Sequence, residues 1–259
     1  MLHVLSPAKT LDYETPLPYA KTTQPIFKPQ SAELIEVLRA YTPAKISKLM
    51  SISEKLAHLN AERYETYQEK PTTKNARAAL FAFKGDVYVG LDAYTFSASD
   101  CEFAQDRLRI LSGLYGILRP LDLLQPYRLE MGTKLETEKG SNLYQFWGGQ
   151  VTNELNKQLK KNRDDVLINL ASNEYFKVVQ TGSLNARVIS PVFKDQKNDK
   201  YKIVSFFAKK ARGVMSGWIV RNRITKPSQL TEFAEWGYRY SAKESTETEP
   251  VFLRKENWK

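Results

Sequence analysis

LSGLYGILRPLDLLQPYRLEMG, residues 111–132, is the stretch around which the rest of the sequence is arranged. Gly113 and Gly116 flank an apolar pair, and two prolines fix bends further along. A segment this apolar should be buried, yet it carries two arginines and two carboxylates. Buried charges are tolerated when they pair with each other or meet a ligand. We therefore expect either a structural loop, in which Arg119 and Asp122 hold the local backbone, or the floor of a cleft.

The composition indicates one globular domain with an anionic partner. The chain has 259 residues, of which 42% are hydrophobic, enough for one substantial core. Its formal net charge of +10 raises the chance that it meets nucleic acid, a nucleotide or an acidic membrane. The sequence lacks an 18-residue apolar run, and residues 1–9 lack the apolar core of a signal peptide, so we expect a cytoplasmic protein.

Cysteine and histidine usage argues against several kinds of site. The single cysteine, Cys101, excludes an internal disulfide and a thiolate-based zinc site. His3 and His58 stand far apart, and neither has a companion at ligand spacing. We expect no metal site and no cofactor, and direct iron binding ranks last among the possible functions because iron needs convergent ligands.

Polar residues follow two expected strands. Residues 2–5 read as a short strand, and Lys9 lies in the loop just after it, where open α/β folds bind ligands. Residues 166–170 read as a second strand, and Ser172 and Tyr175 come directly after it. Asn169 belongs to the same junction. These side chains are candidates for a pocket.

The other segments alternate irregularly between expected helices and strands. We expect a turn and strand over residues 84–91, a helix from a capping box at Ser97 to about residue 111, and one long buried helix over 143–159. Residues 187–193 and 201–207 read as further strands. The chain is therefore expected to be a single α/β domain of mixed α+β type over residues 1–259, without a regular doubly wound sheet.

Residues 43–67 resemble a helix-hairpin-helix element. Two helices with a tight turn between them would offer backbone N–H groups to a phosphate oxygen. Serine replaces both usual glycines, at Ser51 and Ser53, while Ile52 and Ala57 keep their places. Ser53 is equally well explained as an ordinary N-cap. The charges that would support a nucleic-acid contact are Lys45, Lys48 and Lys55.

The excess positive charge is concentrated near the C-terminal third of the chain. Residues 197–226 contain nine basic residues and one acid, Asp199. Residues 206–208 should end a strand, which would place Lys209, Lys210 and Arg212 at the opening of a helix. Cations there oppose the helix dipole, and a bound phosphate would resolve that conflict. We therefore predict an anion site, the alternative being a solvated basic face.

Several blocks of the sequence resemble the bacterial YaaA family of peroxide stress resistance proteins. They span nearly the whole chain in order, and most of them are long and specific. They are SPAKTLDY (6–13), AFKGDVYVGL (82–91), residues 111–132, LYQFWG (143–148), NLASNEYFK (169–177), PVFKD (191–195) and SFFAKKARGVMS (205–216).

The resemblance implies a cytoplasmic protein, induced by hydrogen peroxide, that limits oxidative damage by lowering unincorporated intracellular iron. It also implies an unusual α/β fold with a positively charged cleft, a helix-hairpin-helix element and binding of double-stranded DNA. Lys9, Lys209, Lys210, Arg212 and Arg128 would line the cleft. The two hairpin serines depart from the glycine pattern, and the chain from residue 236 onward matches only loosely.

Two functions follow from these observations. In the first, the protein binds duplex DNA mostly through backbone contacts and without reading sequence, because no helix shows side chains spaced for base edges. In the second, it is an enzyme acting on nucleic acid or a phosphorylated small molecule in the same cleft. The catalytic candidates would be Lys9, Asp122, Glu130, Ser172 and Tyr175.

Overall fold

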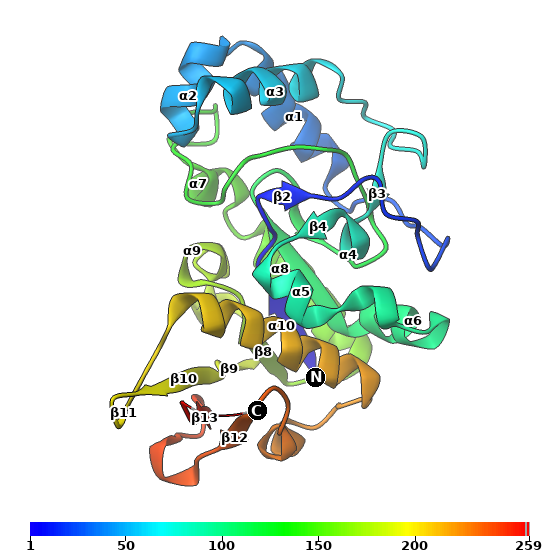
Figure 1. The fold of residues 1–259 in the computed structure, drawn as a ribbon. Coiled ribbons are helices and arrows are strands. Elements are labelled where there is room, and N and C mark those ends of the chain that lie inside the picture. The colour runs from blue at the N-terminus through cyan, green and yellow to red at the C-terminus, as the bar shows by residue number, and fades with distance from the viewer. Residues whose placement is uncertain (257, 259) are drawn as a thin grey trace.

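The computed structural model describes residues 1–256 and 258, and its chain folds around one mixed sheet (Figure 1). The central strand, β1, is buried at all four positions, as its apolar sequence predicts. β5, β1, β8 and β9 run parallel, and β6 is antiparallel to β5. In sheet order the strands are β6 (Gly116–Leu118), β5 (Leu108–Ser112), β1 (Leu2–Leu5), β8 (Val166–Leu170) and β9 (Arg187–Ile189).

A second sheet lies at one end of the molecule, and two short strand pairs complete the β structure (Figure 1). The second sheet holds, in order, β11 (Lys200–Lys202), β10 (Val192–Lys197), β13 (Val251–Arg254) and β12 (Tyr238–Tyr240). The short pairs are β2 (Thr10–Leu11) with β4 (Phe83–Lys84), and β3 (Arg77–Ala78) with β7 (Leu123–Leu124).

Helices surround the central sheet and form the end opposite the second sheet, where α1, α2 and α3 lie (Figure 1). They are α1 (Lys28–Arg39), α2 (Pro43–Met50), α3 (Glu54–Glu65), α4 (Ala79–Ala82), α5 (Asp86–Leu91), α6 (Ala98–Arg107), α7 (Leu143–Trp147), α8 (Gln150–Asn162), α9 (Asn173–Phe176) and α10 (Ser205–Arg221). The short 3-10 turns are η1 (Ala93–Thr95), η2 (Thr181–Ser183), η3 (Pro227–Glu232) and η4 (Ala242–Glu244).

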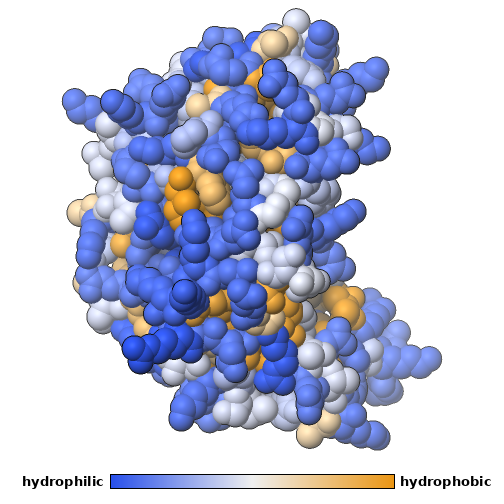
Figure 2. Space-filling view, turned by 180° about the vertical axis from the view of Figure 1, so that it is seen from behind, coloured by the Kyte–Doolittle hydropathy of each residue, from blue (hydrophilic) through white to orange (hydrophobic). Residues whose placement is uncertain are grey.

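Hydrophilic side chains cover most of the face opposite that of Figure 1, and hydrophobic ones come to the surface mainly in its lower half (Figure 2). None of the helices formed by the described residues is long and apolar enough to cross a membrane.

Several expected elements are confirmed. β1 and β8 form over the residues predicted, and α6 begins at the capping box of Ser97 and Asp100. Two helices, α2 and α3, occupy residues 43–65 with the short α2–α3 turn, Ser51–Ser53, between them. Within that turn Ser51 is left-handed, with φ of 50°, and the Ser53 side chain accepts a hydrogen bond from the Leu56 N–H as an ordinary N-cap.

Two predicted boundaries are wrong, because apolar spacing neither distinguishes helix from strand nor locates a break within a helical run. The helix expected to reach residue 111 ends at Arg107, and residues 108–112 form the buried strand β5. The single helix expected over 143–159 is broken into α7 and α8, since Gly148 adopts φ of 47° and is followed by a second glycine.

The strand expected after the turn at residues 84–86 is instead a helix, α5 (Asp86–Leu91), and the reason is its packing against α10. A Cβ at Gly90 would lie 2.2 Å from the Lys210 carbonyl oxygen, and one at Gly213 would lie 1.8 Å from the Val87 carbonyl oxygen. The two backbones thus touch directly, which only glycine permits. The β-branched residues Val87 and Val89 suggested a strand, but this tertiary contact outweighs their propensity.

The basic segment also differs from expectation. Phe206 and Phe207 do not end a strand, because α10 already begins at Ser205. Lys209 and Arg212 therefore lie beyond the first turn, where the helix dipole has little effect, and the predicted dipole conflict does not arise.

α10 also packs, near its start, on a cluster of aromatic rings next to the second sheet. Arg254, on β13, is almost fully buried and lies 4.4 Å from the ring centre of Phe207 and 4.1 Å from that of Trp236. Its Nε donates to Asp195 Oδ1 at 2.6 Å. Lys210 Nζ lies 4.6 Å from the centre of the Trp236 ring. The start of α10 is thereby attached to the second sheet.

We predict that Gly213→Ala lowers the free energy of unfolding by about 1–3 kcal/mol, because the new methyl group forces α5 and α10 apart. Within a helix, alanine is more favourable than glycine by about 1 kcal/mol, so a loss of stability can be attributed to the packing of the new methyl group. Urea denaturation measures it.

Gly182→Ala is the matched control, since a Cβ there would meet no described atom within 4 Å. It should change the free energy by less than about 0.5 kcal/mol. If Gly213→Ala were as stable as the original protein or more stable, the close contact between α5 and α10 would be contradicted.

Candidate functional site: a basic pocket at the strand ends

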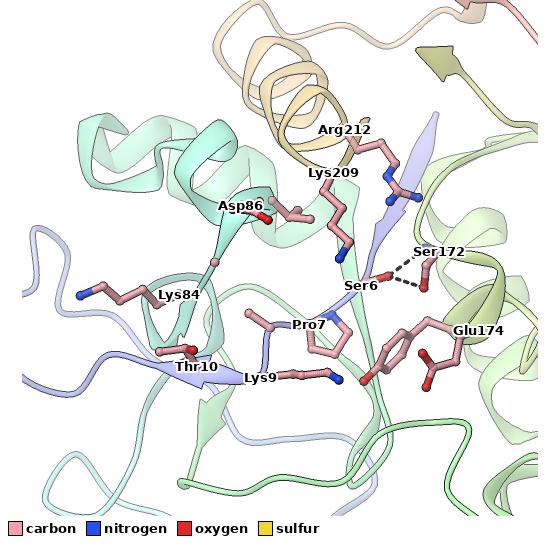
Figure 3. Close-up of a pocket in the computed structure, with 14 residues that line it drawn as sticks. Ser6, Pro7, Lys9, Thr10, Lys84, Asp86, Ser172, Glu174, Lys209 and Arg212 are labelled. Atoms are coloured by element: carbon pink, nitrogen blue, oxygen red, sulfur yellow. Dashed lines mark hydrogen bonds between the residues drawn. The ribbon is translucent and has the colours of Figure 1, made fainter. Parts of the chain in front are cut away.

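A pocket of about 380 Å³ opens where β1 and β8 end (Figure 3). Within the central sheet, the next strand along the chain after β1 is β5, on one side of β1. The next strand after β8 is β9, on the opposite side of β8. Adjacent parallel strands with outward connections in opposite directions leave a crevice beyond their carboxyl ends, where α/β proteins bind ligands. The volume lies within the ~300–1,000 Å³ typical of small-molecule sites. We define this cavity as the basic pocket.

Four segments line the basic pocket: the loop after β1, the start of α5, the start of α9 and one face of α10. Among the described residues, the lining includes four basic side chains and two carboxylates. They are Lys9, Lys84, Lys209 and Arg212, with Asp86 and Glu174. The surplus of positive charge favours an anionic ligand.

Two serines join the loops that follow β1 and β8. Ser6 Oγ accepts a hydrogen bond from the Ser172 N–H at 2.8 Å and donates to Ser172 Oγ at 3.3 Å (Figure 3). The hydroxyl of buried Tyr88, on α5, donates to the Ser6 carbonyl oxygen at 3.1 Å. These bonds fix the floor of the pocket to three elements and so preorganise it.

Lys209 and Arg212 are three residues apart on α10 and point into the pocket from the same side (Figure 3). Arg212 is half-buried and donates to the Ala171 carbonyl oxygen at 3.0 Å. Within residues 1–256 and 258 neither side chain forms an ion pair, and Arg212 Nε is buried without a hydrogen-bond partner. Burial lowers the pKa of the Arg212 guanidinium. An unpaired, partly desolvated arginine is a strong binding group for an oxyanion.

Lys9 enters the pocket from the loop after β1 and is anchored by Glu130. Its Nζ lies 2.7 Å from Glu130 Oε1, and Arg128 donates to the same oxygen at 3.2 Å. The carboxylate thus bridges two cations and leaves a net positive charge at this edge. Lys9 keeps 66% of its side chain exposed, so it can also reach a ligand.

Tyr175 and Glu174 come from α9. Burial is the main cause that raises the pKa of the Tyr175 phenol, which therefore stays protonated and can donate a hydrogen bond. Glu174 accepts from the Gly132 N–H at 3.1 Å. This bond joins the end of the central stretch, residues 111–132, to the pocket wall.

The structure therefore brings together Lys9, Ser172, Tyr175, Lys209 and Arg212, with Glu130 and Arg128 beside Lys9. Asp122 lies elsewhere. It is fully buried, receives hydrogen bonds from the Arg119 backbone and side chain, and accepts from Thr23 Oγ1. Asp122 is therefore not a pocket residue. Arg119 and Asp122 hold a structural loop, whereas Arg128 and Glu130 of the same stretch lie beside Lys9.

Other predicted binding residues are also outside the basic pocket. Lys210 points away from it, toward Trp236, so its predicted place in the lining is wrong. The predicted binding residues of α2, α3 and the turn between them are exposed and lie at the far end of the molecule from the second sheet (Figure 1). None of them lines the pocket within the described chain; they are Lys45, Lys48, Ser51, Ser53 and Lys55.

Sequence reasoning missed Ser6, Lys84, Asp86 and Glu174 as pocket residues. Ser6 follows β1 directly, so the rule that selected Lys9 would also have found it. Lys84 and Asp86 were expected on a turn before a strand, whereas Asp86 begins the helix α5, whose packing on α10 places it at the pocket.

Within the described chain, neither histidine lines the basic pocket. His3 is buried on β1, where burial lowers its pKa to about 3 and its Nε2 lies 3.0 Å from Ser216 Oγ. Among the described residues there is no group of three or more His, Cys, Asp or Glu side chains that could hold a metal ion.

Comparison with known proteins gives a family. The sequence model of the peroxide stress protein YaaA matches residues 1–244. The chain belongs to the YaaA peroxide stress protein family. It is also 58% identical over 256 residues to a UPF0246 protein of Aliivibrio fischeri strain ATCC 700601 / ES114, with 99% of each chain covered. A UPF0246 protein of Aliivibrio fischeri strain MJ11 shows the same identity and coverage.

For this member of the YaaA family we predict that Arg212→Met leaves the free energy of unfolding within about 1 kcal/mol of its original value. The change removes a partly desolvated cation that lacks a carboxylate partner among the described residues, so little stability is lost with it. Chemical denaturation measures the effect.

Arg254→Met is the control, because it makes the same replacement at an arginine that pairs with buried Asp195. Removing it should cost about 3–5 kcal/mol, since a buried carboxylate loses its cation. If Arg212→Met were equally costly, Arg212 would be a structural residue and not one held for a ligand.

Proposed function

We propose that the protein acts in the cytoplasm during peroxide stress by binding double-stranded DNA through its phosphates. The observation that carries this proposal is the pair Lys209 and Arg212, which face the basic pocket without a carboxylate partner among the described residues. Lys and Arg side chains that meet phosphates release counterions, and this release drives binding without regard to sequence. The family supplies the peroxide context.

A second contact would come from the α2–α3 turn. The N–H groups that begin α3, together with exposed Lys45, Lys48 and Lys55, suit a phosphate of the same backbone. In this proposal DNA spans the two regions, and the protein limits oxidative damage while lowering unincorporated iron indirectly.

We predict salt-dependent DNA binding that depends on Lys209. The logarithm of the association constant should fall by about 0.9 per phosphate neutralised for each tenfold rise in salt. Lys209→Gln should lower this slope by about one unit and weaken binding at every sequence tested. Labelled duplex DNA titrated at several salt concentrations measures both quantities.

Lys157→Gln is the control, because Lys157 is 77% exposed on α8 and is not among the described residues that line the pocket. A combined replacement of Lys45, Lys48 and Lys55 by glutamine tests the α2–α3 turn separately. Binding that ignores salt, absence of binding at low salt, or an equal loss in Lys157→Gln would overturn the proposal.

The alternative function is an enzyme that acts on nucleic acid or on a phosphorylated small molecule in the same pocket. It is favoured by the convergence of Lys9, Ser172 and Tyr175 on one cavity at the strand ends. The cations would stabilise negative charge that develops in the transition state, and the protonated Tyr175 would donate a hydrogen bond.

For the enzymatic alternative we predict that Tyr175→Phe abolishes protection against peroxide in cells while fold and DNA affinity are retained. The replacement keeps the ring and removes only the hydroxyl group. Tyr41→Phe, a half-buried tyrosine after α1, is the control and should protect normally. Full protection by Tyr175→Phe would argue against a chemical role for this hydroxyl.

A further inference from the structure

A second cavity of about 550 Å³ lies against the basic pocket. Ser172, Glu174 and Arg212 line both cavities, so the two are neighbours across these side chains. The second cavity is bounded on its far side by the segment before β10 and by the turn that precedes β13. We define it as the neutral chamber, because most of its described lining residues are uncharged.

The neutral chamber differs from the basic pocket in its chemistry. Its described lining contains one basic side chain, Arg212, and two carboxylates, Glu174 and Glu249, and the other polar groups are amides and hydroxyls. They are Asn169, Asn173, Ser172, Ser190 and Ser205. Ile203 and Ala208 add apolar surface. Such a lining suits an uncharged body with several hydrogen-bonding groups.

Arg212 occupies the boundary between the two cavities. One guanidinium nitrogen is held by the Ala171 carbonyl oxygen, while Nε is buried and has no partner among the described residues. A buried donor without a partner is costly, so a ligand atom that accepts from it would gain more than at an exposed site. A ligand held at Arg212 can extend into both cavities.

Two further groups of the chamber are free to bind. The Asn173 amide and the Glu249 carboxylate form no side-chain hydrogen bond or ion pair with the part of the chain that the structure describes. Asn173 can both donate and accept, as the edge of a nucleobase requires. A carboxylate accepts hydrogen bonds from a sugar diol, as in dinucleotide sites.

We propose that the two cavities together bind one nucleoside monophosphate unit. Its phosphate lies in the basic pocket on Lys209 and Arg212, and its sugar and base lie in the neutral chamber near Glu249 and Asn173. This inference rests on the proposed phosphate binding and specifies its ligand. The unit has two sources, a free nucleotide or a nucleotide turned out of a DNA strand, and both present the same groups.

Calorimetric titration of the full chain tests the proposal with AMP, GMP, CMP and UMP, each compared with inorganic phosphate and with the corresponding nucleoside. At least one nucleotide should bind about tenfold more tightly than phosphate, because hydrogen bonds in the chamber add to those of the phosphate. Arg212→Met should weaken both nucleotide and phosphate by about tenfold or more, since it removes charged hydrogen bonds.

Ser205→Phe separates the chamber from the pocket. Ser205 is exposed and lines only the chamber, so a large ring there should reduce nucleotide affinity to that of phosphate and leave phosphate binding unchanged. Ser228→Phe, at an exposed serine of η3, is the matched control and should change neither.

The outcomes distinguish the inference from the function on which it rests. Phosphate and DNA binding with no gain for any nucleotide, or with no effect of Ser205→Phe, overturns the nucleotide site and leaves phosphate binding intact. Failure of both phosphate and DNA to bind overturns both. Binding of a duplex with one unpaired nucleotide is then compared with binding of a fully paired duplex. Tighter binding of the duplex with the unpaired nucleotide supports a nucleotide turned out of a DNA strand as the ligand, and equal binding supports a free nucleotide.

Discussion

The direct contact between the backbones of α5 and α10 is the constraint on which the candidate site depends. Gly90 and Gly213 remove the side chains that would keep the two helices apart. The contact places Asp86, at the start of α5, across from Lys209 and Arg212 on α10 (Figure 3). Since α10 also packs on β1 and β8, one helix sets the position of the cations relative to the strand ends.

The sequence predicts the elements whose signals are local. β1 and β8 are short apolar runs bounded by polar residues, and the capping box at Ser97 marks the start of α6, so all three could be read directly. α5 could not be, because its β-branched residues indicate a strand and only the packing of Gly90 against α10 makes it a helix. The break between α7 and α8 depends on the backbone angle at Gly148, which apolar periodicity does not report.

The candidate site was partly predictable for the same reason. Lys9 and Ser172 follow strands, and parallel strand ends meet at one edge of a sheet, so topology alone joins them. The roles of Asp122 and Lys210 depend on partners distant in sequence: Thr23 accompanies Arg119 around Asp122, and Trp236 faces Lys210. Charge and spacing give no information on such partners, and both residues were therefore placed in the wrong environment.

The aromatic cluster at the start of α10 has a consequence for observing the protein. Trp236 faces Lys210 and Arg254, and its ring centre lies 6.1 Å from that of Phe207. The indole therefore touches the helix that carries Lys209 and Arg212, on the side away from the cavities. A displacement of this helix would therefore change the surroundings of Trp236, one of the four tryptophans of the chain, and with them its fluorescence.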